Sequence, residues 1–167
     1  MRATSLVMVL VLAGTVGLCG CGKSAEQKRL EADLNSQIMK GHEVLMEKAK
    51  QAAVLLTQLD SAIAISDSLI KEHPNGTGGL TSSDLIAARD KVEGSRSALD
   101  SWMQGHTPYN EGIKHERAMA QLQTDLNALT QVGDQMDTAI VNATKAIAVH
   151  REFVNTLSAG GPKSRRK

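Results

Sequence analysis

Apolar residues recur at every third or fourth position through most of this chain, which is the spacing of one face of an α-helix. Between residues 38 and 70 the steps alternate between four and three, as at the a and d positions of a coiled coil. This stretch predicts a first helix over about 24–72, ended at His73-Pro74 because proline cannot continue a helix. Its apolar seam comprises Ile38, His42, Leu45, Ala49, Ala52, Leu56, Leu59, Ile63, Ser66 and Ile70.

Two further seams have the same spacing. One predicts a helix over about 82–104 that ends at Gly105. The other predicts a helix over about 108–158 that begins at Thr107-Pro108, because proline favours the first helical position. The two seams comprise Leu85, Ala88, Val92, Ser95, Leu99 and Trp102, and then Met119, Leu122, Leu126, Leu129, Gly133, Met136, Ile140, Ala143, Ile147, His150, Val154 and Leu157.

These seams predict an all-α fold, an elongated, coiled-coil-like antiparallel bundle of three long helices. The alternative is a four-helix bundle with a break at Gly133, although the heptad phase continues across that glycine. At 1.5 Å per residue the first and third helices would reach roughly 75 Å and the second roughly 34 Å. A three-helix monomer should therefore leave seam positions uncovered for a second copy, namely Ile38, Leu45, Ile140, Ile147 and Val154.

The N-terminus has the features of a bacterial lipoprotein signal. Arg2 precedes an uncharged apolar run over residues 6–18, which is too short to span a membrane. Leu18-Cys19-Gly20-Cys21 resembles the bacterial lipobox, and Cys21 fits the lipidated position better than Cys19. We therefore expect a signal peptide over 1–20, a lipid-anchored N-terminus over 21–23 and a helical bundle domain over 24–159. Gly22-Lys23 after the cysteine favours the outer membrane, facing the periplasm.

Composition narrows the classes of function. Of 167 residues, 41% are hydrophobic, yet the only aromatic residues are Trp102, Tyr109 and Phe153, which disfavours a nucleobase-stacking protein. Residues 160–167 carry four basic side chains and no acid, which predicts a disordered basic tail. The body before this tail has more acidic than basic side chains, so we expect no nucleic-acid partner. Both cysteines lie in the signal region, which leaves no thiol for catalysis or a disulfide.

Catalytic sequence motifs are absent, and we expect no enzyme activity. Methionine and histidine recur at helical spacing, and thioether with imidazole is a ligand set suited to Cu(I). An antiparallel first hairpin would place residue 103 level with about residue 51, near Met46. The speculative metal ligands are His42, Met46, Met103 and His106. The alternative is that these side chains fill gaps in the core, as methionine commonly does.

Residues 38–46 and 99–103, followed by a long Leu/Ile/Ala helix, resemble a group of small exported helical proteins of Bacteroidetes-like bacteria, some labelled "viral A-type inclusion protein". On that pattern the matching positions are His42, Met46, Trp102 and Met103. Those proteins usually have a proline after the motif methionine, where this chain has Glu47. The resemblance implies an exported helical domain and no particular activity. We therefore expect a cell-envelope lipoprotein that acts as a non-catalytic interaction or scaffold module, with a homo-oligomer or an envelope protein as its partner and Cu(I) binding as the alternative function.

Overall fold

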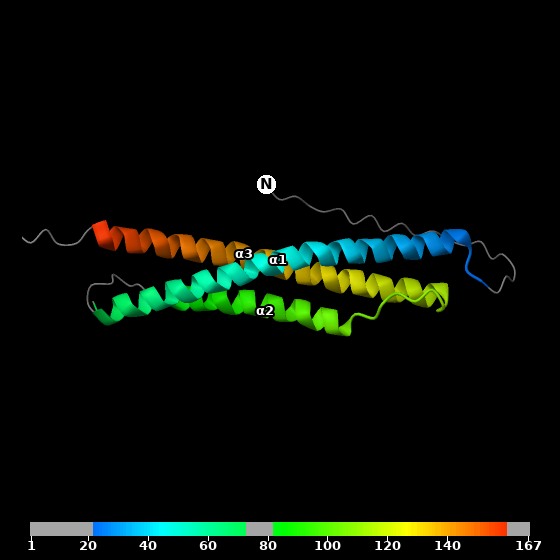
Figure 1. Cartoon of the computed structure of the whole chain (residues 1–167), viewed down its shortest axis with the longest axis horizontal. Coiled ribbons are helices and arrows are strands. Elements are labelled where there is room, and N and C mark those ends of the chain that lie inside the picture. Colours follow the sequence, from blue (N-terminus) through cyan, green and yellow to red (C-terminus); the bar gives the residue numbers. More distant parts are fainter. Residues whose placement is uncertain (1–21, 73–81, 160–167) are drawn as a thin grey trace, which may run out of the picture.

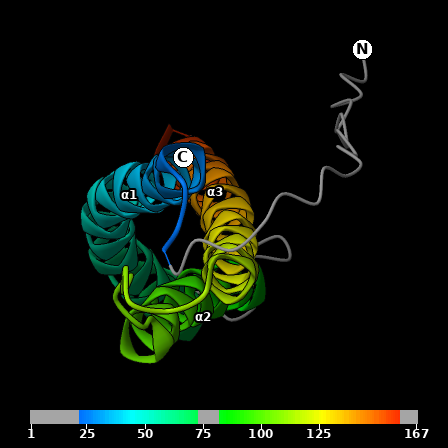
Figure 2. The same cartoon turned by 90° about the vertical axis from the view of Figure 1, so that its right-hand side faces the viewer.

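The computed structural model describes residues 22–72 and 82–159 as a bundle of three helices. Helix α1 (Ala25–Glu72) and helix α3 (His115–Ala159) lie side by side and run in the same direction, and α2 (Ser83–Gly105) runs antiparallel to both along about half their length (Figure 1). Viewed end-on, the three helices form a triangle (Figure 2). The predicted all-α class with three helices is confirmed. The four-helix alternative is wrong, because α3 continues through Gly133.

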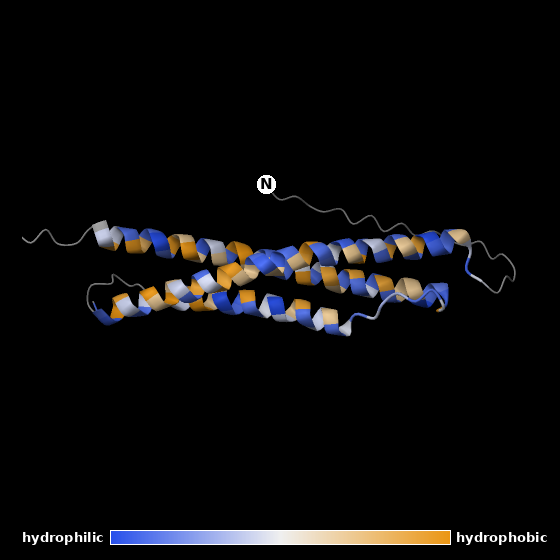
Figure 3. Ribbon diagram, viewed as in Figure 1, coloured by the Kyte–Doolittle hydropathy of each residue, from blue (hydrophilic) through white to orange (hydrophobic). Residues whose placement is uncertain are grey.

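The helices pack through faces that include most of the predicted seams and are wider than them. The core also contains Leu55, Ala62, Val132 and Ala139, which the seams omit, whereas Leu56, Ile63 and Ile140 of the seams are only partly buried. Figure 3 shows apolar and polar residues alternating along each helix. Two apolar clusters form the core, one in each half of the bundle. One cluster lies in the half of the bundle where α2 begins and contains Ala52, Leu55, Leu59, Leu85, Val92, Ala143 and Ile147. The other lies in the half where α1 begins and contains Ile38, Leu45, Leu99, Leu122, Leu129 and Met136.

Glycine permits a close approach between α1 and α3. A Cβ atom on Gly41 would lie 2.8 Å from Cδ2 of Leu129, which is too close without a shift of that side chain. One turn further on, Gly133 faces Leu45 across the same interface, with 3.6 Å between an added Cβ and Cδ2 of Leu45. Small residues at a crossing bring two helix axes together, so Gly133 serves contact between helices rather than a break in one.

The predicted start of the third helix at residue 108 is wrong, because residues 106–114 form a non-helical connector. The Asn110 side chain accepts a hydrogen bond from the backbone N–H of Gly112 at 2.8 Å, and such local bonds compete with helix formation. The connector carries the chain beyond the end of α2 (Figure 1), so that α3 begins beside the first turns of α1.

This connector also overturns the expectation of uncovered seams. Because α3 starts level with the beginning of α1, the two long helices cover each other along nearly their full length. Ile38 is fully buried, Leu45 is 3% exposed and Ile147 is 9% exposed, while Ile140 and Val154 are partly buried. The single chain therefore covers the seams for which we expected a second copy.

Candidate functional site

The most unusual site is a buried carboxylate at the end of the bundle where α1 begins. Glu31 is fully buried and accepts hydrogen bonds from three side chains. Lys23 Nζ lies 2.6 Å from Oε2, the Tyr109 hydroxyl also donates to Oε2, and His115 Nδ1 lies 2.8 Å from Oε1. Lys23 Nζ also lies 5.6 Å from the centroid of the Tyr109 ring. We refer to these four residues as the Glu31 clamp.

Local sequence explains how each part of the clamp is positioned. Glu31 lies one heptad before Ile38, and His115 lies one heptad before Leu122, so both face the core. Ser24 and Gln27 form a reciprocal capping box, each side chain accepting a hydrogen bond from the other's backbone N–H, and this fixes the start of α1 beside Lys23. The connector turn at Asn110 follows Tyr109 directly.

The clamp keeps Glu31 charged. Burial alone would raise the pKa of the Glu31 carboxyl, but hydrogen bonds from Lys23, Tyr109 and His115 outweigh it and lower the pKa from 4.5 to about 2. The hydrogen bond to this carboxylate, together with burial, raises the pKa of the Tyr109 hydroxyl from 10.0 to about 12. Because an ionised carboxylate has no proton to donate, Nδ1 of His115 must carry the hydrogen.

This geometry makes the clamp a structural joint rather than a reactive centre. Both carboxylate oxygens already accept hydrogen bonds, and neither is open to a substrate, because Glu31 has no exposed area. The clamp joins three separate segments of the chain. Lys23 belongs to the segment before α1, Tyr109 to the connector and His115 to the first turn of α3, so one buried charge ties three separate segments together.

The predicted metal ligands lie around a second cluster, built on the single tryptophan. The ring of His106 stacks on Trp102 with centroids 4.9 Å apart, and the ring of His42 lies 5.8 Å away at a tilt of 31°. Trp102 Nε1 donates to the backbone oxygen of Asp125 at 3.3 Å. His106 Nδ1 is 3.2 Å from Oδ2 of Asp125, close enough for an ion pair, but the two atoms are not aligned for a hydrogen bond.

The structure therefore brings His42 and His106 to one indole ring. Met46 and Met103 are 38% and 37% exposed, so neither is fully packed in the core. The prediction that residue 103 lies at the same height along the bundle as residue 51 is wrong, because the neighbouring Trp102 packs against His42. A short loop predicts the alignment of α1 with α2 only if α1 ends level with the start of α2. Here the packing of the apolar side chains sets that alignment. Within 22–72 and 82–159, no group of three His, Cys, Asp or Glu residues could hold a metal.

A third polar pair lies in the other half of the bundle. Ser66 and His150 each lie 35 residues beyond a clamp residue, Glu31 and His115 respectively, and so take the same heptad positions. Ser66 is fully buried and His150 is 8% exposed. In contrast to Glu31, the Ser66 hydroxyl and His150 Nε2 have no hydrogen-bond partner among the described residues. Burial lowers the pKa of His150.

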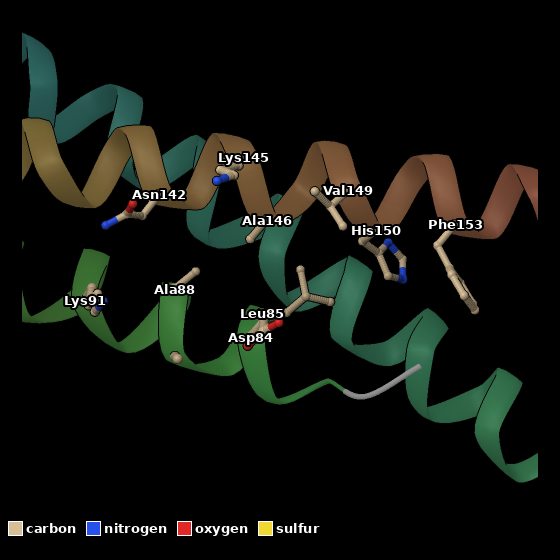
Figure 4. A pocket seen from close by; sticks show the side chains of 11 residues that line it. Asp84, Leu85, Ala88, Lys91, Asn142, Lys145, Ala146, Val149, His150 and Phe153 are labelled. Atoms are coloured by element: carbon tan, nitrogen blue, oxygen red, sulfur yellow. The ribbon is translucent and has the colours of Figure 1, made fainter. Parts of the chain in front are cut away.

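His150 lies at the wall of a groove between α2 and α3. Figure 4 shows its imidazole projecting from α3 on the same side as Phe153, which lies one turn further along α3. This part of the groove has a volume of about 430 Å³. Lys91 of α2 lines both this part and an adjoining one of about 420 Å³ that reaches Gly94 and Asp134. We call the two parts together the α2–α3 groove.

Comparison of the chain with protein-family models, with curated proteins and with solved structures gives no match. The fold and the site therefore rest on this chain's own residues.

One helix in the part of the chain that the structure describes, α1, is long and apolar enough to cross a membrane by length and composition, and it lies near the N-terminus. These properties are compatible with a signal or a membrane anchor. The same helix supplies Leu55 and Leu59 to the core. The predicted signal peptide, the lipidation site Cys21, the stop at His73-Pro74 and the basic tail lie outside the described residues.

Sequence reasoning missed the Glu31 clamp, although a signal for it was present. The apolar seam of the first helix begins at Ile38, and one heptad earlier the same face carries an acid. One heptad before Leu122 the third seam carries a histidine. Two ionisable residues of complementary chemistry at core positions, each at the start of a seam, indicate a buried polar layer.

Proposed function

We propose that this chain is a lipid-anchored, non-catalytic helical scaffold of the bacterial cell envelope. The observation that carries the proposal is the Glu31 clamp. Lys23, which is two residues from the predicted lipidation site Cys21, is tied through Glu31 to the start of α3 and to the connector. Only Gly22 then separates the lipid-bearing residue from the folded bundle, so the bundle stands on a short tether.

The dimensions of the bundle suit such a role. Helix α1 has 48 residues and therefore extends about 72 Å at 1.5 Å per residue. The clamp is at the end nearest the membrane, and Ser66 and His150 are toward the far end. A rod of this length, fixed at one end, holds a contact surface away from the lipid. The resemblance to exported helical proteins at His42, Met46, Trp102 and Met103 supports the same class of function.

We favour the outer membrane as the location of the lipid anchor, with the helical bundle facing the periplasm, because Gly22-Lys23 follows the predicted lipidated cysteine. A homo-oligomer or an envelope protein is the partner of such a scaffold.

The experiment that tests the scaffold places one photo-crosslinking residue at each end of α1. Leu30 is 46% exposed near the clamp, and Asp67 is exposed near the opposite end. In intact cell envelopes we expect the probe at Leu30 to crosslink to lipid and the probe at Asp67 to crosslink to protein. Replacing residues 1–21 by a secretory signal that is cleaved without lipidation should abolish the lipid adduct at Leu30. Equal lipid labelling at both positions would contradict a bundle that stands away from the membrane.

A second candidate function, Cu(I) binding, is favoured by one observation. His42 and His106 lie against the same indole ring, and Nδ1 of His106 has no hydrogen-bond partner among the residues the structure describes. Met46 lies four residues after His42, and Met103 directly follows Trp102. Both methionines are partly exposed and so accessible to a soft metal. These four residues supply thioether and imidazole ligands of the type that Cu(I) prefers.

A further inference from the structure

The α2–α3 groove is long enough for a helix. It extends along α3 from Asp134 to Phe153, which is about 28 Å at 1.5 Å per residue. Small side chains line it from both helices, including Ala88 and Ala146, and this gives the groove its depth. An α-helix of about 20 residues has a matching length, and amphipathic helices bind in apolar grooves of this kind.

Gly94 keeps part of the groove open. A Cβ atom built on Gly94 would meet no atom within 4 Å, so no neighbouring side chain requires glycine there. Glycine inside a helix is unfavourable by about 1 kcal/mol relative to alanine. This open position therefore has no packing role in the bundle itself, and it allows the backbone of a fourth helix to approach α2.

Charge along the groove alternates in sign. Lys91 lies where its two parts meet, and Lys145 of α3 lines the part that contains Phe153. Asp84 lines the part that contains Phe153, and Asp134 lines the opposite part. None of these four side chains forms an ion pair within the described ranges. The groove thus presents an acidic, basic, acidic order along its length.

The ring of His150 forms part of the wall of this groove. Its side chain is more than nine-tenths buried, Nε2 has no partner in the part of the chain that the structure describes, and the ring lines the groove (Figure 4). Because Nε2 has almost no accessible surface, the ring offers an apolar edge, and not a hydrogen bond, to a binding partner. Phe153, half-buried at the same end, offers an aromatic contact for an apolar side chain of that partner.

We propose that the α2–α3 groove binds an amphipathic helix of a partner protein, with an acidic residue at its centre and basic residues toward its ends. The inference rests on the proposed scaffold function and names the surface and the partner chemistry. Glutamate or aspartate of the partner pairs with Lys91 and Lys145. Its basic residues pair with Asp84 and Asp134, and its apolar stripe packs over the small residues to complete a four-helix layer.

The test uses the full chain in detergent and two fluorescent helical peptides of about 20 residues with one shared leucine stripe. One peptide has glutamate at its centre and lysine at its ends, and the second has the reverse order. Measured by fluorescence anisotropy, the first should bind at least about tenfold more tightly than the second. Added salt should reduce this difference, because it screens charge pairs.

Substitutions in α2 separate groove binding from general adhesion. Gly94→Leu should fill the groove and weaken binding about tenfold or more, without lowering the melting temperature. Ser97→Leu, an exposed α2 position outside the groove, should bind as the parent does. Lys91→Glu with Lys145→Glu should abolish the preference between the two peptides, because the centre of the groove then repels glutamate while Asp84 and Asp134 still attract lysine. This pair keeps the test informative should Gly94→Leu fail to fold.

Three outcomes would overturn the proposal: equal affinity for both peptides, undiminished binding by Gly94→Leu, or self-association of the parent that Gly94→Leu abolishes. The last would assign the groove to a second copy of the chain. Failure here is distinguishable from failure of the scaffold function, because the crosslinking positions Leu30 and Asp67 lie on α1, away from this groove.

Discussion

The Glu31 carboxylate and the His115 imidazole meet across 2.8 Å, and each residue lies one heptad before a buried apolar residue of its helix, Ile38 or Leu122. The same two heptad positions recur 35 residues later as Ser66 and His150. Two polar layers therefore bracket the apolar core between α1 and α3. Buried polar residues at core positions of coiled coils specify register, and the layer at Glu31 aligns the start of α3 with the start of α1.

Removing the charge at the clamp should destabilise the bundle. In Glu31→Gln the buried Lys23 ammonium loses its carboxylate, and breaking one partner of a buried ion pair typically costs about 3–5 kcal/mol. We expect the free energy of unfolding in urea to fall by about 3 kcal/mol. Glu43→Gln, an exposed change on the same helix, is the matched control. A loss as small as that of the control would show that the clamp contributes nothing to stability.

The clamp should also limit the pH range of stability. The folded pKa of Glu31, about 2, lies below its ordinary value of 4.5. Its contribution is therefore present above pH 4.5 and disappears as the pH falls from 4.5 toward 2. The folded pKa of Tyr109, about 12, lies above 10.0, so its contribution is present below pH 10 and disappears as the pH rises toward 12.

Melting temperatures measured across this range, for the parent and for Glu31→Gln and Tyr109→Phe, separate these effects from other titrations. We expect the difference between the parent and Glu31→Gln to shrink below pH 4.5, and the difference for Tyr109→Phe to shrink above pH 10. Differences that stay constant with pH would contradict the assignment of either group.

The sequence predicted the fold class and part of the core, because heptad spacing indicates the centre of the face that a helix buries. It missed Leu55 and Val132, which lie beside the seams, because each helix contacts two others and so buries a wider face than one seam. Leu59, Val92 and Met136 were all placed correctly in the core. The connector over 106–114 could not be predicted from the sequence, because Thr107-Pro108 is a favourable helix start by local preference. The hydrogen bond between Tyr109 and Glu31, 78 positions apart, favours a different path, and such a distant contact leaves no local signal.

Lipidation can be tested one cysteine at a time. Cys21→Ala should block acyl labelling and leave an unprocessed precursor, because the lipid is attached at that thiol. Cys19→Ala should change labelling little, since Cys19 lies inside the predicted signal peptide. Metabolic labelling with a fatty-acid analogue and gel mobility give the readout. Normal labelling of Cys21→Ala would show that a different residue or export route is used.

Ile147 distinguishes a core role from a role between two copies. Ile147 is 9% exposed within the apolar cluster of the chain itself, so Ile147→Asp places a carboxylate in that core. We expect unfolding to become easier by about 3 kcal/mol, equally at every protein concentration. A stability loss that disappears at high concentration, or a clean shift from dimer to folded monomer in sedimentation, would instead place Ile147 between two copies.

The copper alternative depends on Met46 and Met103. If they bind Cu(I), the parent should bind the metal with a defined stoichiometry under reducing conditions, and binding should raise the melting temperature. Met46→Leu and Met103→Leu keep the apolar volume and should each cost less than about 1.5 kcal/mol of stability. A ligand role predicts lost copper affinity with an intact fold. Binding that survives both substitutions would leave these methionines as packing residues.

The separation of 84 positions between Glu31 and His115 sets an order of events during synthesis and export. Chain closure becomes entropically more costly with separation, and α1 can first pair only with α2, which lies nearer in sequence. On the proposed route across the membrane, Cys21 and Lys23 emerge long before His115. The thiol would thus be modified on an open, unclamped chain. Closing of the clamp would then mark a protein that has been delivered in full, and a chain truncated before α3 would remain tethered yet recognisably incomplete.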